Sequence, residues 1–136
     1  MHALNAAFRL GATLAVAMML AGPARADHHT VKVAKNDKIG AHLTDAKGMT
    51  LYVFQKDSAG KSACAGPCVE KWPIYFREKV GVSGDLKPSD FGTITREDGK
   101  KQTTYKGMPL YYFAGDKAPG DANGQGLLNV WTAATP

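Results

Sequence analysis

An internal repeat constrains the fold of this chain more than any other feature of its sequence. Segment 47–57, KGMTLYVFQKD, reappears 59 positions later as KGMPLYYFAGD at 106–116, with seven identities in eleven positions. Trp72 and Trp131 stand at the same offset. Each half of such a chain is too small to bury a hydrophobic core alone. The repeat therefore predicts two halves that share one core and are related by a pseudo-twofold axis.

The local patterns within the first half are those of strands and turns. Residues 30–33 alternate polar and apolar side chains. Residues 41–43 lead through the turn-forming segment 45–48 into the apolar run 50–54, which predicts a β-hairpin. A short helical segment is expected between Ser62, as its cap, and Pro73, which stops it.

The second half has the same character. Its expected strands are 92–95, 102–105 and 110–113, with turns at 97–100 and 106–107. A single helical turn is expected at 89–91. The predicted fold class is therefore mainly β (α+β by strict count), with antiparallel strands and hairpins from two pseudo-symmetric repeats sharing one core, and one or two short helices.

The first 26 residues have the pattern of a secretory signal peptide. A leader with one positive charge precedes the apolar run 10–22, and Ala24-Arg25-Ala26 has the small-x-small pattern of a cleavage site. The apolar run is shorter than the ~20 residues that span a bilayer. We therefore expect cleavage near Ala26-Asp27, a periplasmic or secreted protein without a stable membrane anchor, and a single domain at 27–136 with halves of about 27–80 and 81–136.

The charge of the chain argues against nucleic acid as a partner. Of 17 Lys and Arg residues, two leave with the signal, so that 15 face 12 acidic residues and the net charge of the mature chain is +3. Only Lys100 and Lys101 are adjacent, whereas a nucleic-acid surface needs clustered basic residues with aromatic ones among them. A small ligand or another envelope protein is the kind of partner left open.

The repeated segments and GKSACAGPCVEKWP at 60–73 resemble the bacterial secreted-repeat family of predicted lipoproteins, which has a Tyr-x-aromatic-x-x-Asp motif. The motif residues here are Tyr52, Phe54 and Asp57 in the first half, and Tyr111, Phe113 and Asp116 in the second. The resemblance runs from about residue 39 to 131. It implies export but no activity, because the family is functionally uncharacterised. Many members carry a lipidated cysteine at the cleavage site, where this chain has Ala26-Asp27, so we expect no lipid anchor.

Cys64 and Cys68 are the only cysteines of the chain. In an exported protein such a pair favours a structural disulfide, and closing a five-residue loop stabilises the fold by about 2 kcal/mol. A soft-metal site and a thiol-redox pair are the alternatives. The second half has Asn123 and Leu127 at the equivalent positions, so the function of the pair is not needed twice.

The motif residues have a structural interpretation. Tyr52 and Phe54 alternate along one strand and share a face that we expect to be core, as do Tyr111 and Phe113, with a ligand-stacking platform as the alternative. Trp72 and Trp131 are expected to be buried at related places. The carboxylates of Asp57 and Asp116 are expected to accept backbone N–H groups in the turns that follow the strands.

Copper is the metal that the residue types suggest, and no other cofactor is expected. Soft ligands suit Cu(I), and the candidates are His42, Met49, its repeat equivalent Met108, Cys64 and Cys68. Cleavage after Ala26 would also leave an N-terminal Asp27-His28-His29. Its amine, two backbone amides and the His29 imidazole can form the tetragonal nitrogen set that Cu(II) or Ni(II) prefers.

Three common motifs of catalytic and cofactor-binding sites are absent from this sequence. It contains no nucleophile elbow, haem-attachment sequence or paired-His zinc motif, and its mature part has three histidines, two of them at its start. We therefore expect a small exported non-catalytic binding or structural protein, stabilised by a Cys64–Cys68 disulfide. The main alternative is a periplasmic copper-binding or thiol-redox protein that uses the cysteine pair, the N-terminal Asp-His-His, or both. The least favoured alternative is an enzyme whose site the sequence does not reveal.

Overall fold

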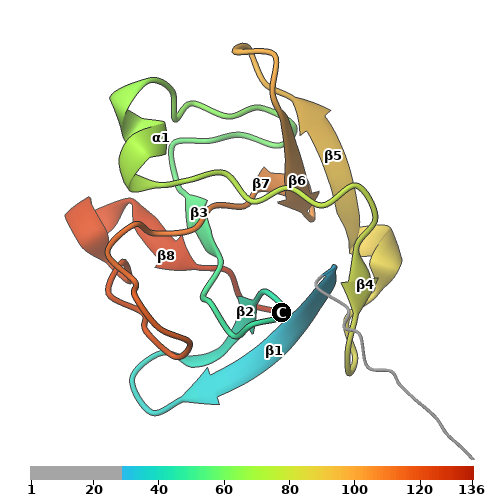
Figure 1. Cartoon of the computed structure of the whole chain (residues 1–136), viewed down its shortest axis with the longest axis vertical. Coiled ribbons are helices and arrows are strands. Elements are labelled where there is room, and N and C mark those ends of the chain that lie inside the picture. Colours follow the sequence, from blue (N-terminus) through green and yellow to red (C-terminus); the bar gives the residue numbers. More distant parts are fainter. Residues whose placement is uncertain (1–28) are drawn as a thin grey trace, which may run out of the picture.

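The computed structural model describes residues 29–136, which form short strands and short helices joined by long connections (Figure 1). The expected signal peptide, Asp27 and His28 lie outside the described residues. The described elements are β1 (Thr30–Asn36), β2 (Gly40–Thr44), β3 (Tyr52–Phe54), α1 (Pro67–Lys71), β4 (Gly81–Val82), η1 (Pro88–Asp90), β5 (Phe91–Thr95), β6 (Lys101–Tyr105), β7 (Met108–Pro109), η2 (Leu127–Asn129) and β8 (Trp131–Ala133).

The strands form three small sheets with the orders β2-β1-β4, β3-β8 and β5-β6-β7. All strand pairs in the described part are antiparallel except β1 with β4, which is parallel. The prediction of a mainly β fold with short helices is confirmed.

Two equivalent hairpins open the two halves. The β5–β6 hairpin follows the prediction, and its turn closes through the Arg96 N–H, which donates to the Lys100 carbonyl at 2.8 Å. Gly99 adopts φ 85° in this turn, a conformation that favours glycine. In the first half the hairpin is β1–β2, where the Asn36 side chain accepts the N–H groups of Lys38 and Ile39 at 2.7 and 2.9 Å.

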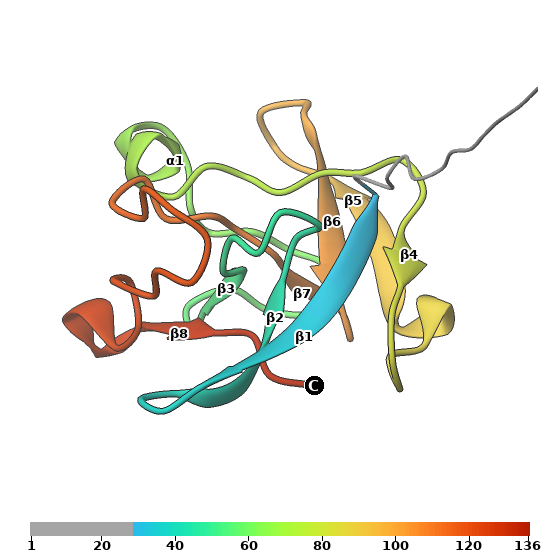
Figure 2. The same cartoon turned by 60° about the horizontal axis from the view of Figure 1, so that its bottom comes forward.

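The predicted pairing of 41–43 with 50–54 is wrong for most of its length. Only a bridge between Thr44 and Thr50 and the neighbouring hydrogen bond from Leu51 N–H to the Leu43 carbonyl connect these segments. The strand β3 instead pairs with β8, from the other end of the sequence (Figure 2).

This pairing is one side of an exchange between the halves. The segment 131–134 of the second half pairs with 51–54 of the first. Correspondingly, segment 73–75 of the first half lies against 110–112 of the second, with hydrogen bonds from Tyr112 N–H to the Pro73 carbonyl at 2.7 Å and from Tyr75 N–H to the Leu110 carbonyl at 3.0 Å. Each half therefore completes the sheet of the other.

The pseudo-twofold axis passes between Tyr52 and Tyr111. These repeat-equivalent residues pair with each other, the N–H of each donating to the carbonyl of the other at 2.7 and 2.9 Å. Two equivalent residues can pair reciprocally in this way only where the axis passes between them. The repeat prediction of two pseudo-symmetric units is confirmed at this pair.

The buried apolar residues come from both halves, so the predicted shared core is confirmed. One cluster consists of Val31, Leu43, Leu51, Tyr75, Leu86, Tyr105, Leu110 and Ala134. The other consists of Tyr52, Cys64, Trp72, Tyr111, Trp131 and Ala133, and residues of α1 pack against it.

Two further local predictions need correction. The helix α1 begins at Pro67 after Gly66, whose φ is 60°, and Ser62 is not its cap, because the loop closed by the cysteines occupies the preceding residues. Segment 110–113 is not a regular strand; Tyr111 makes isolated bridges to Tyr52 and Ile74 because it crosses between two partners. The short turn expected at 89–91 is present as η1.

Candidate functional site

Four aromatic rings stack across the pseudo-twofold axis, and we call them the aromatic stack. The order is Phe54, Trp131, Trp72 and Phe113, with ring centroids 4.3, 3.7 and 4.5 Å apart. The two indoles at the centre are nearly parallel, at 3°. Trp72 is 5% and Trp131 2% exposed, which confirms their predicted burial at related places. Phe54 and Phe113, at the ends, are only half-buried.

The tyrosine and aspartate of the motif join one half to the other. The Tyr52 hydroxyl donates to Asp116 Oδ2 and the Tyr111 hydroxyl to Asp57 Oδ2, each at 2.7 Å. The other carboxylate oxygens accept backbone N–H groups as predicted, from Ala63 at 2.6 Å and from Asn123 at 2.8 Å. The hydrogen bonds between these tyrosines and aspartates were not predicted from the sequence, although the presence of both residue types in both repeats could have indicated them.

Burial of these groups shifts their pKa values. Loss of solvent raises the pKa of Tyr52 and of Tyr111 well above the usual range, and the hydrogen bond to an aspartate raises both further. Burial also raises the pKa of Asp57, an effect that the Ala63 N–H, the Tyr111 hydroxyl and the Arg96 charge oppose. The tyrosines therefore keep their protons as donors, which suits a role in holding the halves together.

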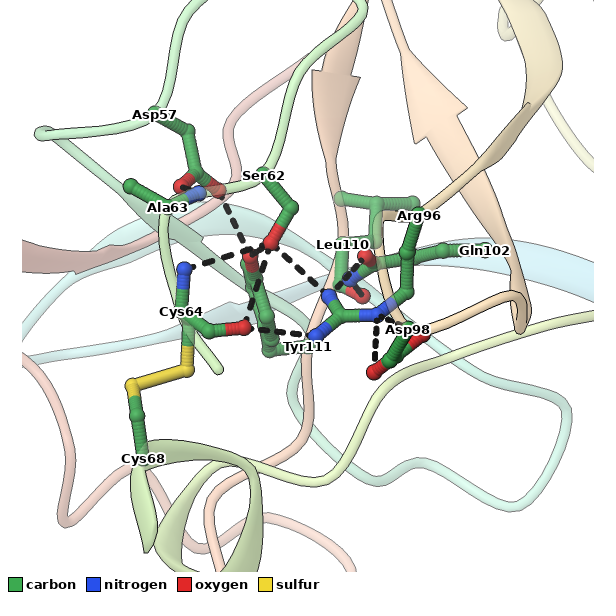
Figure 3. The surroundings of a disulfide bond; sticks show 10 residues. All are labelled: Asp57, Ser62, Ala63, Cys64, Cys68, Arg96, Asp98, Gln102, Leu110 and Tyr111. Atoms are coloured by element: carbon green, nitrogen blue, oxygen red, sulfur yellow. Dashed lines mark hydrogen bonds and ion pairs between the residues drawn. A yellow bond between two sulfur atoms is a disulfide. The ribbon is translucent and has the colours of Figure 1, made fainter. Parts of the chain in front are cut away.

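The Cys64–Cys68 disulfide is present, as the main interpretation of the pair predicts (Figure 3). Its loop is held by Arg96, whose side chain is only 2% exposed. The guanidinium donates from Nη2 to the Cys64 carbonyl at 2.6 Å and from Nη1 to Ser62 Oγ at 2.8 Å. Ser62 Oγ in turn lies 2.6 Å from the Tyr111 hydroxyl, so the disulfide loop and the motif belong to one network.

The remaining donors of Arg96 are paired within its own hairpin. Nη1 also donates to Gln102 Oε1 at 2.8 Å, and Nε lies 3.1 Å from Asp98 Oδ2. The side-chain amide of Gln102 in turn donates a hydrogen bond from Nε2 to the Leu110 carbonyl at 2.7 Å. The guanidinium is thus used to hold three segments of the chain together. The sequence analysis did not single out Arg96, because an arginine in a charged hairpin turn has the pattern of a solvent-exposed residue.

A groove, which we call the aromatic groove, opens beside the aromatic stack between α1 and η2. Its volume is about 400 Å³, and its lining residues are Phe54, Lys56, Pro67, Cys68, Lys71, Trp72, Leu128, Val130 and Trp131. Leu128 is 80% exposed at its edge. Leu128 and Asn129 both adopt positive φ, 54° and 60°, a region that is uncommon for a bulky apolar residue. The sequence analysis missed Leu128, which carries no motif.

The described part of the chain gives partners to three of the predicted copper ligands, His42, Cys64 and Cys68. Residues 29–136 contain no group of three or more His, Cys, Asp and Glu side chains that could hold a metal ion. His42 is buried with Nδ1 2.9 Å from the Gly40 carbonyl oxygen, and Cys64 and Cys68 are joined to each other. The N-terminal copper site stays a prediction, since Asp27 and His28 lie outside the described residues.

The two repeats also appear in the comparison with known proteins. A protein-family model described as a secreted repeat of unknown function matches residues 33–75 and 92–135. Searches of curated proteins and of solved structures found no significant match. Between residues 29 and 136, no helix is long and apolar enough to cross a membrane.

Proposed function

Because the chain belongs to the family of secreted repeats of unknown function, we propose that it is an exported, non-catalytic binding protein whose ligand occupies the aromatic groove. The place of action is the periplasm or the medium. The disulfide supports this location, since such bonds persist in oxidising compartments.

The observation that carries the proposal is the aromatic groove itself. Small-molecule sites are mostly apolar and about 300–1,000 Å³ in volume, and the groove has both of these properties. Leu128 leaves most of its side chain in water at the edge, where a ligand would cover it. Its positive φ is the kind of backbone strain that recurs at ligand clamps.

The lining supports binding more than catalysis. It contains no Ser, Thr, His, Asp or Glu, the residues from which most nucleophiles and general bases are drawn. Its only cysteine, Cys68, is held in the disulfide. The carboxylates of the motif are engaged with the tyrosines and with backbone N–H groups, away from this lining.

Binding of an uncharged aromatic dye tests the proposal. N-phenyl-1-naphthylamine becomes fluorescent in apolar sites, and we expect the wild type to bind it. Leu128→Ser should weaken binding about tenfold, because burial of a leucine side chain contributes ~1.5 kcal/mol or more. Leu127→Ser is the matched control, since Leu127 lies on the same turn, is 37% exposed and does not line the groove.

Leu128→Ser should unfold within about 0.5 kcal/mol of the wild type, because Leu128 is 80% exposed, whereas Leu127→Ser should lose about 1 kcal/mol and still fold, because Leu127 is 37% exposed. Absence of dye binding by the wild type, or equal losses in the two variants, would show that the groove is not the ligand site.

A further inference from the structure

Two lysines give the aromatic groove a positive charge. Lys56 follows β3, and Lys71 is the last residue of α1; both line the groove and both are exposed. No acidic side chain lines it. The ion pairs within residues 29–136, Lys61 with Glu97 and Arg96 with Asp98, involve neither lysine. The groove therefore holds two ammonium groups without a carboxylate partner.

The pseudo-symmetry indicates that the fold does not need these lysines. Their repeat equivalents are Gly115 and Val130. At Gly115 the ring of Phe113 lies so close to the backbone that an added Cβ would clash with it, so this end of the aromatic stack has no room for a side chain like that of Lys56. The same repeat thus folds with glycine and valine in place of the two cations.

The rings that line the groove favour a flat, electron-rich body. Trp131 stacks with both Phe54 and Trp72 and is only 2% exposed, so the half-buried Phe54 is the ring of this group that a ligand in the groove can reach. Aromatic edges carry partial positive charge and pack well against the faces of other rings. The apolar Leu128 and Val130 complete the contact surface.

Resting on the groove as the ligand site, we propose that the ligand is a small organic anion with a flat aromatic body. Its rings pack against Phe54, Leu128 and Val130, and its acidic group pairs with Lys56 and Lys71. A volume of about 400 Å³ suits a molecule of this size.

Two dyes that differ only in one sulfonate group test whether the groove prefers an anionic ligand. 8-Anilinonaphthalene-1-sulfonate has the rings of N-phenyl-1-naphthylamine and adds one sulfonate. At low ionic strength we expect the wild type to bind the sulfonate about tenfold more tightly than the neutral dye, from two exposed ion pairs. The preference should shrink in ~0.5 M salt, where screening is stronger.

The double variant Lys56→Gln/Lys71→Gln should lose this preference and keep its affinity for the neutral dye. The control Lys32→Gln/Lys38→Gln removes the same net charge from exposed residues outside the groove, and it should keep the preference.

The outcomes separate the two proposals. If the neutral dye binds at Leu128 but the sulfonate gains nothing, or if both double variants lose the gain equally, the inference on charge is wrong and the groove stays the ligand site. If the neutral dye does not bind, the proposed function fails, and the inference falls with it. Binding only to vesicles containing phosphatidylglycerol would overturn the small-molecule ligand in favour of a membrane surface.

Discussion

The hydroxyl groups of Tyr52 and Tyr111 should each stabilise the fold, because each one donates a hydrogen bond to an aspartate of the opposite half. Removing them one at a time, by Tyr52→Phe and Tyr111→Phe, deletes a hydrogen bond to an aspartate of the opposite half without changing the ring. The rings would still pack against Trp72 and Trp131 at 5.4 and 5.1 Å between centroids.

The expected loss follows from the partners. The Tyr52 hydroxyl donates to Asp116 at 2.7 Å and accepts the Gly124 N–H at 3.1 Å. A hydrogen bond to a charged group contributes about 1.5–3 kcal/mol and a neutral one about 1 kcal/mol. We therefore expect each variant to lose about 2–3 kcal/mol of unfolding free energy, out of the ~5–15 kcal/mol of a domain.

Urea unfolding at pH 7 measures these losses. Tyr75→Phe is the control, because the Tyr75 hydroxyl is buried and has no hydrogen-bond partner. Its removal should leave the unfolding free energy unchanged or slightly raise it. The reasoning would be refuted by losses below 0.5 kcal/mol for Tyr52→Phe and Tyr111→Phe, or by an equal loss for Tyr75→Phe.

The loss in Tyr111→Phe should also depend on pH. Burial holds the pKa of Asp57 above its ordinary value of 3.8, so the folded state binds this proton more tightly and stability from Asp57 falls as pH rises through the folded pKa. The Tyr111 hydroxyl opposes the shift, and its removal raises the pKa further. The destabilisation should therefore be largest at neutral pH and shrink as the pH falls toward 3.8. A loss of unfolding free energy that is equal at neutral pH and near pH 3.8 would contradict this role of the Tyr111 hydroxyl.

Two further changes test the network around the disulfide. Arg96→Met should lower the unfolding free energy in urea by about 3–5 kcal/mol, because it leaves buried acceptors, among them the Cys64 carbonyl, without their donor; a loss below 1 kcal/mol would show that the guanidinium is not essential. Replacing Cys64 and Cys68 together by serine should lower it by about 2 kcal/mol, and a reductant should lower the Tm of the wild type but not that of the double variant. A wild-type Tm that does not respond to the reductant would indicate that the loop holds without its bond.

The repeat and the local turn chemistry made much of the fold predictable. The identities around Tyr52 and Tyr111 predicted the pseudo-symmetry, and the common offset of Trp72 and Trp131 predicted their shared burial. The β5–β6 hairpin could be placed because its strands alternate and Gly99 marks its turn. In each case the signal lies within a few residues of the feature that it specifies, or in the repeat itself.

The exchange between the halves could not be predicted in this way. β3 can pair with the end of its own half or with the equivalent end of the other, and the two ends carry the same tryptophan. Identical local patterns do not distinguish the two arrangements. Burial of Arg96 depends in turn on acceptors that the disulfide loop supplies from the other half. The exposed Leu128 belongs to a groove that forms only after both halves have packed.

The exchange of segments between the halves also determines at what stage of its synthesis this chain can complete its fold. During synthesis the amino end emerges first, yet β3 finds its partner only when β8, within the last six residues, has followed. Until then the indole of Trp72 has no Trp131 to stack on, and the Phe54 ring has no Trp131 beside it. Such non-local contacts make folding slow to begin. The two halves can therefore close on each other only once nearly the whole of the described chain is available.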